Sequence, residues 1–155
     1  GYSPRQRLDL VINILTNLAY HKKEISVFGG SQLRPNIHIK DMVRAYELFI
    51  EIDPNKINGK IFNVGFENKT VNELALSVKS VIGNDVKINT VPTDDNRSYH
   101  VSSQKIFREL GFEAKFTIKD AVIDLKNAFD NKLLKNTLEN IDYFNIKKMQ
   151  NLKLS

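Results

Sequence analysis

The chain has 155 residues, 41% hydrophobic and 26% charged, which suits one compact domain with its own core and argues against wholesale disorder. Cysteine is absent, no apolar stretch is long enough for a membrane span, and the first residues lack a signal-peptide core. We therefore expect a cytoplasmic protein with no disulfide, no thiolate metal site and no membrane partner.

The formal net charge of +5 makes nucleic acid the first partner to consider. Adjacent basic residues occur only as Lys22-Lys23 and Lys147-Lys148, and acidic residues are spread throughout the chain. We therefore expect a solvated, lysine-rich surface and no nucleic-acid partner. A basic site for a small anion is the second interpretation.

Helical spacing of apolar residues predicts a first helix from Ser3-Pro4 to about Tyr20. Serine suits the N-cap, and proline suits the first helical position because its missing N–H would be unused there. Residues 24–28 then alternate as in a short strand, which stops at the turn Gly29-Gly30.

Pro35 rules out a helix in the next segment and favours extended backbone at Arg34. Asp41 is placed to cap a following helix, which closes at Asp53-Pro54. Residues 60–65 alternate as a strand that runs into a turn.

Thr70 and Glu73 have the spacing of a capping box, which predicts a helix ending near Gly83. A strand is expected over residues 86–91, and helices over residues 103–110 and 117–129. Weaker helical segments form a tail over residues 131–155.

The alternation of helices and short strands predicts a mixed α/β fold. We expect a single domain over residues 1–155 and find no linker or repeat. The strands are too few for a complete doubly wound sheet, and the chain begins with a helix where a dinucleotide-binding half begins with a strand and a glycine-rich turn.

No catalytic constellation emerges from the residues. The seven glycines lack the spacing of a dinucleotide or phosphate loop, and His21, His38 and His100 lack metal-ligand spacing. Tyr143 and Lys147 have the Tyr-x-x-x-Lys spacing of short-chain dehydrogenases, but no dinucleotide-binding half precedes them. We interpret this pair as packing or surface, and we predict no catalytic, cofactor-binding or metal-binding residue.

Two arginine-bearing segments carry the stronger signal, residues 32–41 with Arg34 and residues 95–99 with Arg97. The guanidinium fork can give two parallel hydrogen bonds to phosphate oxygens, each contributing roughly 1.5–3 kcal/mol. An arginine that precedes proline in extended backbone is held more rigidly than one on a helix face. On these grounds alone, an arginine whose side chain is simply solvated is more common than one that binds phosphate.

The order of four segments resembles the extended short-chain dehydrogenase class, in its NAD-dependent epimerase/dehydratase family. Residues 29–41 are similar to a family segment with Gly, Gln, Arg, His and Asp at these spacings, and residues 58–65 to a strand ending in Phe-Asn-Val-Gly. Residues 70–75 are similar to the next helix, and residues 95–112 to a segment with Asp-x-Arg-x-Tyr, Lys and Leu-Gly-Phe. The set covers nearly the whole chain.

The resemblance implies the C-terminal, substrate-binding portion of a nucleotide-sugar enzyme, lacking most of the Rossmann sheet. It implies that Arg34 and Arg97 approach the diphosphate and that Gln32 contacts the nucleotide ribose or phosphate. Arg7 and Asn13 resemble substrate-lining residues, with Arg5 competing for the role of Arg7. His38 and Asp41 are expected to be structural, as a strand residue and a helix cap.

The family's glycine-rich fingerprint, acidic ribose-binding residue and upstream Tyr-Lys pair are absent from this sequence. We therefore expect a fragment, or one half of a divided protein, that neither binds NAD tightly nor turns over substrate alone. The expected partners are a nucleotide-diphosphate sugar and an N-terminal Rossmann domain carrying NAD, with a homodimer left open. The alternatives are a non-catalytic domain that binds a sugar-nucleotide or a protein and, less favoured, a basic nucleic-acid binder.

Overall fold

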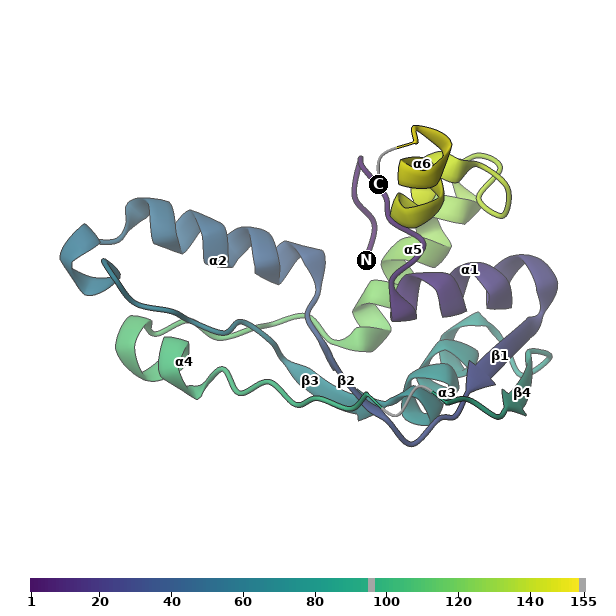
Figure 1. Ribbon diagram of the computed structural model, residues 1–155, viewed down its shortest axis with the longest axis horizontal. Helices are drawn as coiled ribbons and strands as arrows, with labels where there is room; N and C mark the ends of the chain where they lie inside the picture. The colour runs from purple at the N-terminus through teal and green to yellow at the C-terminus, as the bar shows by residue number, and fades with distance from the viewer. Residues whose placement is uncertain (95–96, 154–155) are drawn as a thin grey trace.

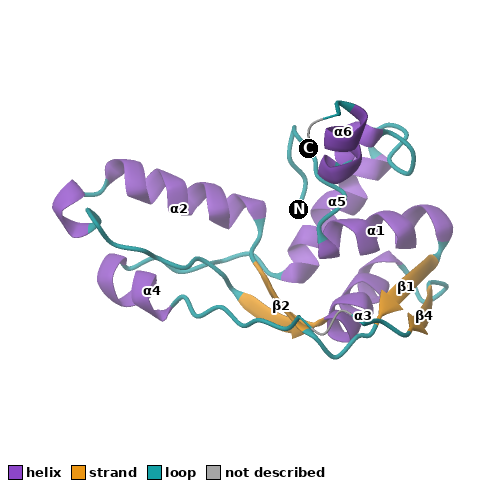
Figure 2. Ribbon diagram, viewed as in Figure 1, coloured by secondary structure: helices purple, strands orange, loops and turns teal. Residues whose placement is uncertain are grey.

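The computed structural model describes residues 1–94 and 97–153, so the start of the second arginine-bearing segment, Asp95-Asn96, and the last two residues lie outside the described part. Its helices and strands confirm the mixed α/β class (Figures 1 and 2). In chain order they are α1 Val11–Lys22, β1 Glu24–Phe28, β2 Leu33–Asn36, α2 Ile39–Glu51, β3 Glu67–Thr70, α3 Val71–Ile82, β4 Lys87–Val91, α4 Gln104–Leu110, α5 Ile118–Asp130 and α6 Asn145–Asn151, with 3-10 turns at Pro54–Lys56 and Ile141–Tyr143.

The strands of the described residues form two small sheets. β1 and β4 pair in parallel, with Ile25 opposite Ile88, and β2 and β3 pair antiparallel, with Leu33 opposite Thr70. The parallel pair supports the expectation that most of a Rossmann sheet is missing from this part of the chain.

The main core lies between α1, α3, α5 and strand β1 (Figure 1). Its buried side chains come from each of these elements, because each presents one apolar face: Leu15 and Ala19, Ile25 and Val27, Leu74 and Val78, and Val122. A second, smaller core of Ala45, Ile106 and Phe112 joins α2 to α4, which extend away from the main core.

Local signals placed several elements correctly. Thr70 and Glu73 form the predicted capping box at the start of α3, and Gly83 ends that helix. A second capping box, of Thr117 and Asp120, begins α5. In both, the threonine hydroxyl accepts from a main-chain N–H and the carboxylate accepts from the threonine N–H, so two main-chain donors at the start of each helix are satisfied.

The predicted start of the first helix is wrong, since α1 begins at Val11 with Leu10 as its N-cap. Residues 1–10 are irregular because other bonds hold them. The Ser3 N–H donates to the side chain of Gln6 at 3.0 Å, and the Leu8 N–H donates to the carbonyl of Tyr143 at 2.9 Å.

The expected roles of His38 and Asp41 are also corrected. His38 is the N-cap of α2, and its Nδ1 accepts from the N–H of Lys40 at 3.1 Å. Asp41 lies inside the first turn, fully buried, and accepts from the N–H groups of Lys115 and Phe116. Its carboxylate therefore ties α2 to the segment before α5 instead of capping its own helix.

The strand predicted over residues 60–65 is not formed in the described structure. The strand of this region is β3, Glu67–Thr70, which pairs with β2, while residues 60–66 are not part of any strand. An alternating pattern predicts extended backbone, but a strand also needs a neighbour to pair with.

The tail is helical only in part. A 3-10 turn at Ile141–Tyr143 leads into α6, and both follow irregular backbone over residues 131–140. Asn17 in α1 donates to the carbonyl of Thr137 at 3.0 Å, which fastens this part of the tail to the main core.

Candidate nucleotide-sugar site

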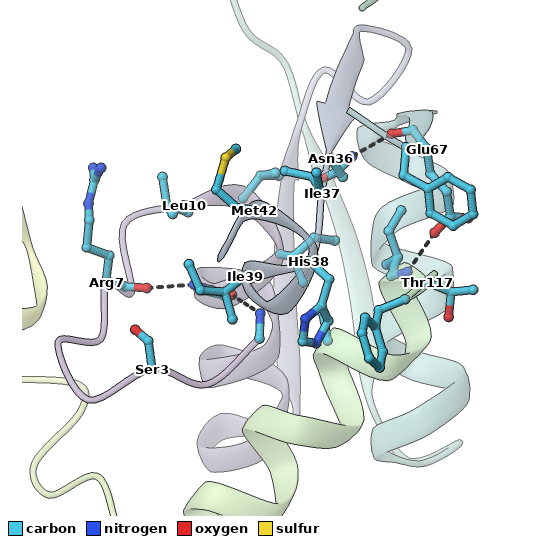
Figure 3. Close-up of a pocket in the computed structure, with 18 of the residues that line it drawn as sticks. Ser3, Arg7, Leu10, Asn36, Ile37, His38, Ile39, Met42, Glu67 and Thr117 are labelled. Atoms are coloured by element: carbon cyan, nitrogen blue, oxygen red, sulfur yellow. Dashed lines mark hydrogen bonds between the residues drawn. The ribbon is translucent and has the colours of Figure 1, made fainter. Parts of the chain in front are cut away.

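A pocket of about 410 Å³ opens where residues 1–13, the junction of β2 with α2, and the start of α5 meet (Figure 3). Its walls are largely apolar, with Leu10, Ile37, Ile39 and Met42 among them. Arg7, Asn13, Asn36, Glu67 and Thr117 are among its polar lining residues. An apolar cavity with a few fixed polar groups is the usual form of a small-molecule site.

The pocket brings together two of the predicted site residues, Arg7 and Asn13. Asn13 is buried and its Nδ2 donates to the carbonyl of Arg7 at 2.8 Å. The guanidinium of Arg7 forms two bonds to Asp9, at 2.9 and 3.1 Å. Arg5 also lines the pocket, but its guanidinium donates to Asn145 in the tail.

Asp9 connects the pocket wall to α6. Partial burial acts to raise the pKa of its carboxyl, but hydrogen bonds from Arg7 and from the N–H of Asn145, with the charge of Arg7, hold that pKa below its ordinary value. The Asn145 N–H lies 3.0 Å from the carboxylate. Asp9 therefore stays ionised and fixes the direction of Arg7.

His38 lines the pocket from the N-cap of α2, with its side chain fully buried. Burial lowers its pKa, and the positive charges of Lys40 and of the protonated N-terminal amine add to the effect, against the carboxylate of Asp124. Its Nε2 lies 3.3 Å from an oxygen of Asp124, which also pairs with Lys40 at 2.9 Å. The neutral ring suits its capping role, because Nδ1 must accept a bond.

Arg34 and Arg97 meet beside the antiparallel sheet, although 63 residues separate them in the chain. The guanidinium of Arg34 donates to the carbonyl of Arg97 and to its neighbour Leu33. It also lies 5.1 Å from the ring centre of Tyr99, a cation–π contact. The structure therefore holds the Arg34 side chain between β2 and the segment that carries Arg97.

Gln32 braces the turn between β1 and β2. Its Oε1 accepts from the N–H of Gly30 at 2.6 Å, and its Nε2 donates to the carbonyl of Phe28 at 2.7 Å. Gly30 has a φ of 112°, which L side chains rarely adopt, so the turn depends on glycine as well as on this brace.

The five predicted residues thus fall into two groups. Arg7 and Asn13 line the pocket, whereas Gln32, Arg34 and Arg97 lie outside its lining. Pro35 and Asn36 connect the groups, because they follow Arg34 directly and belong to the pocket wall.

Glu67 and Thr117 of the pocket wall were not predicted from the sequence. Glu67 accepts from the N–H of Ile118 at 2.6 Å, and Thr117 caps α5. The strand that carries Glu67 was missed, because no local pattern marks its position. Tyr99 could have been noticed, since it follows Arg97 by two residues in the same motif.

Tyr143 and Lys147 make contacts that belong to the packing of the tail. The hydroxyl of Tyr143 accepts from the N–H of Lys135 at 3.4 Å, and the ammonium of Lys147 lies 4.7 Å from the ring centre of Phe144. Within the described residues, no group of three or more His, Cys, Asp or Glu side chains could hold a metal ion. No described helix is long and apolar enough to cross a membrane.

Residues 1–65 match the model of the NAD dependent epimerase/dehydratase family. Among curated proteins, the chain is 32% identical over 109 residues to UDP-D-apiose/UDP-D-xylose synthase of Oryza sativa subsp. japonica, a match that covers 68% of this chain and 26% of that protein. It is 31% identical over 109 residues to UDP-D-apiose/UDP-D-xylose synthase 2 of Arabidopsis thaliana, covering 68% of this chain and 27% of that protein.

Solved structures extend the similarity to most of the fold. The UDP-glucose 4-epimerase of Thermotoga maritima with UDP-glucose superposes with a TM-score of 0.72 at 26% identity, covering 86% of this chain and 44% of that one. The UDP-glucuronic acid 4-epimerase of Bacillus cereus, in complex with UDP-glucuronic acid and NAD, has the same fold with a TM-score of 0.72 at 20% identity, covering 84% and 43%. The chain thus spans about a quarter of the curated relatives and less than half of these structures.

Proposed function

Because this chain belongs to the NAD-dependent epimerase/dehydratase family, we propose that it is the part of a nucleotide-sugar epimerase or dehydratase that grips the nucleotide-sugar. Two solved relatives support this proposal, since they were determined with UDP-glucose and with UDP-glucuronic acid. The whole reaction, with its hydride transfer to NAD and back, requires more of the protein than this chain.

The pairing of Arg34 with the Arg97 segment carries the proposal. A diphosphate needs cationic forks that converge from more than one direction, and here two chain segments bring an arginine each to the same edge of the β2–β3 sheet. Tyr99 and the Arg97 carbonyl position the Arg34 side chain in advance, which reduces the entropy lost on binding.

The pocket beside these arginines is proposed to take another part of the same ligand. Arg7 and Asn13 line it, and their direction is fixed by Asp9 and by the Arg7 carbonyl. The side-chain oxygen and nitrogen of Gln32 each make one hydrogen bond, and each can make a second. It therefore retains the capacity to bind a ribose or phosphate oxygen while it braces the turn.

The described residues do not form an NAD-binding site. A dinucleotide site needs a glycine-rich turn between a strand and a helix at the carboxyl edge of a parallel sheet, and the described parallel sheet has only β1 and β4. We propose that this chain alone binds NAD weakly and has no turnover. Any catalytic step belongs to the part of the protein that holds NAD.

Calorimetry with UDP-glucose and UDP measures directly how tightly this chain binds the nucleotide-sugar and its nucleotide. We expect Arg34→Ala and Arg97→Ala each to weaken binding by about ten- to a hundredfold, the value of one or two charge-assisted bonds. Arg108→Ala is the matched control, since Arg108 is an exposed arginine of the last turn of α4. Equal effects of all three substitutions, or equal binding of duplex DNA, would contradict the proposal.

A further inference from the structure

The sequence contains one Asn-Gly pair, Asn58-Gly59, which lies in an exposed turn after the 3-10 turn Pro54–Lys56. The N–H of Lys60 donates to the carbonyl of Ile57 at 3.0 Å and closes the turn around the pair. Gly59 has a φ of 68°, which glycine adopts easily because it has no β-carbon. A β-carbon added to Gly59 would meet no heavy atom within 4 Å beyond its chain neighbours. The pair is therefore open to solvent.

The two groups of this pair that can react with each other have no hydrogen-bond partner in the described part of the chain. They are the side-chain amide of Asn58 and the main-chain N–H of Gly59. Most main-chain N–H groups of a folded protein donate to an acceptor, which holds them in place. The Gly59 nitrogen is instead accessible as a nucleophile, and its attack on the side-chain carbonyl carbon of Asn58 closes a five-membered ring. A β-carbon on the residue after asparagine hinders this closure, and glycine has none.

A second turn of the chain provides an internal comparison. In residues 83–86 the N–H of Val86 donates to the carbonyl of Gly83 at 3.2 Å, and the exposed Asn84 has the same place in this turn as Asn58 has in the first. The next position holds Asp85, whose carboxylate lies 3.3 Å from the ammonium of Lys23. The two asparagines thus share exposure and turn bonding, and they differ in the residue that follows.

Asn55 is exposed as well, three residues before Asn58, but the N–H group that follows it is engaged. The N–H of Lys56 donates to the carbonyl of Asp53 at 2.9 Å, within the 3-10 turn. Lys56 also has a β-carbon. Neither condition for ring closure is met at Asn55, so exposure alone does not distinguish Asn58 from other asparagines.

We propose that Asn58 is a site of spontaneous deamidation, with rearrangement of the main chain to isoaspartate. The nitrogen of Gly59 loses its proton to solvent and attacks the side-chain carbonyl carbon of Asn58. A new C–N bond forms, the C–N bond of the side-chain amide breaks, and ammonia leaves with a proton taken from water, so that a cyclic imide remains. Water then opens the imide at either carbonyl and gives aspartate or isoaspartate. The net change is the hydrolysis of one amide, which requires only water.

The product changes both the charge and the geometry of the turn. A carboxylate replaces a neutral amide between Lys56 and Lys60. In isoaspartate the main chain also passes through the former side-chain carbons, so it is longer by one methylene, and the Lys60 N–H no longer faces the Ile57 carbonyl. Asn58 is absent from the lining of the candidate nucleotide-sugar pocket, so the modification acts on a surface apart from that site.

Mass spectrometry of the folded protein after storage at neutral pH tests the proposal. Trypsin cleaves after lysine and arginine, which places Asn55 in fragment 45–56 and Asn58 in fragment 57–60. Fragment 57–60 should gain about one dalton, and an isoaspartyl carboxyl methyltransferase with a labelled methyl donor should then label it. Asn58 should be modified at least about tenfold faster than Asn55 or Asn84, because glycine follows only Asn58. No gain at Asn58, an equal gain at Asn84, or a product without isoaspartate overturns the proposal.

Three substitutions at exposed positions test the role of the glycine. Asn58→Gln keeps an amide but cannot close a five-membered ring, so fragment 57–60 should no longer gain mass. Gly59→Ala should slow the reaction at Asn58 by about tenfold or more, because it adds a β-carbon. Asp85→Gly gives Asn84 the neighbour that Asn58 has, and Asn84 should then react at a rate within about tenfold of that of Asn58. An unmodified Asn84 in Asp85→Gly, or an unaltered rate at Asn58 in Gly59→Ala, overturns the proposal.

Discussion

The buried carboxylate of Asp41 accepts a hydrogen bond from the N–H of Phe116, 75 residues further along the chain, at 2.8 Å. The same oxygen accepts from Lys115, and the other oxygen pairs with Arg44. This contact joins α2 to the start of α5, between which the pocket opens. It therefore holds two walls of the candidate site together.

We expect Asp41→Ala to lower the free energy of unfolding by roughly 2–4 kcal/mol, because it removes charge-assisted bonds and leaves buried donors without an acceptor. Urea denaturation of the chain measures this change. Glu47→Ala, an exposed acidic position on the same helix, should change stability by less than about 0.5 kcal/mol. A similar small change for Asp41→Ala would show that the carboxylate does not fasten α2.

The capping box of α5 provides a second stability test. Thr117→Ala should cost about 1 kcal/mol, since the Asp120 N–H loses its acceptor at the first turn. Thr117→Ser keeps the hydroxyl and should recover most of that loss. If the serine and alanine variants melt at the same temperature, the hydroxyl does not act as a cap.

Stability should fall as the pH decreases from 7 to 5, with His38 as one cause. The pKa of His38 is lower in the folded chain, mainly through burial, so the unfolded chain binds more protons in this range. Its stabilising contribution is complete above the unfolded pKa of about 6.5 and is lost as the pH falls through the lower folded pKa.

The variant His38→Asn keeps a side-chain acceptor for the N-cap and cannot titrate. Its stability, measured by urea denaturation at several pH values, should depend less on pH between 7 and 5 than that of the unmodified chain. His100→Asn, at an exposed histidine, is the comparison. An unaltered pH dependence in His38→Asn would assign the effect to other groups.

Tyr99 should act on ligand affinity through Arg34. Tyr99→Leu removes the ring that lies against the guanidinium, and we expect UDP-glucose affinity to fall by a few-fold, in line with roughly 0.5–1 kcal/mol for an exposed cation–π contact. Tyr99→Phe retains the ring and should bind as the unmodified chain does. A loss in Tyr99→Phe equal to that in Tyr99→Leu would point to the hydroxyl and against this contact.

Tyr143 and Lys147 should be dispensable for chemistry. In the protein with its NAD-binding part, Tyr143→Phe and Lys147→Ala should leave kcat for a nucleotide-sugar within about twofold, because their contacts are those of tail packing. A fall of kcat by about a hundredfold or more in either variant, with KM unchanged, would instead make the pair catalytic.

Much of the secondary structure could be predicted from the sequence, because it depends on interactions between residues that are close together in the chain. The capping boxes at Thr70 and Thr117 act between residues three apart, and Gly111 ends α4 with a φ of 68° that glycine adopts easily. The same holds for β1, whose alternation is a property of adjacent residues. The choice of Arg34 and Arg97 came from resemblance to a family, and the local residues gave no reason to prefer them over other arginines.

Only the tertiary structure decided how distant segments meet. Ser3-Pro4 is a good local start for a helix, yet bonds to Gln6 and to Tyr143 keep residues 1–10 irregular. Residues 60–65 have a strand pattern but no neighbour within the described chain to pair with. Arg34 reaches the Arg97 segment, and Asp41 reaches Phe116, across 63 and 75 residues. Such contacts depend on how segments far apart in the chain pack together, and no local pattern encodes them.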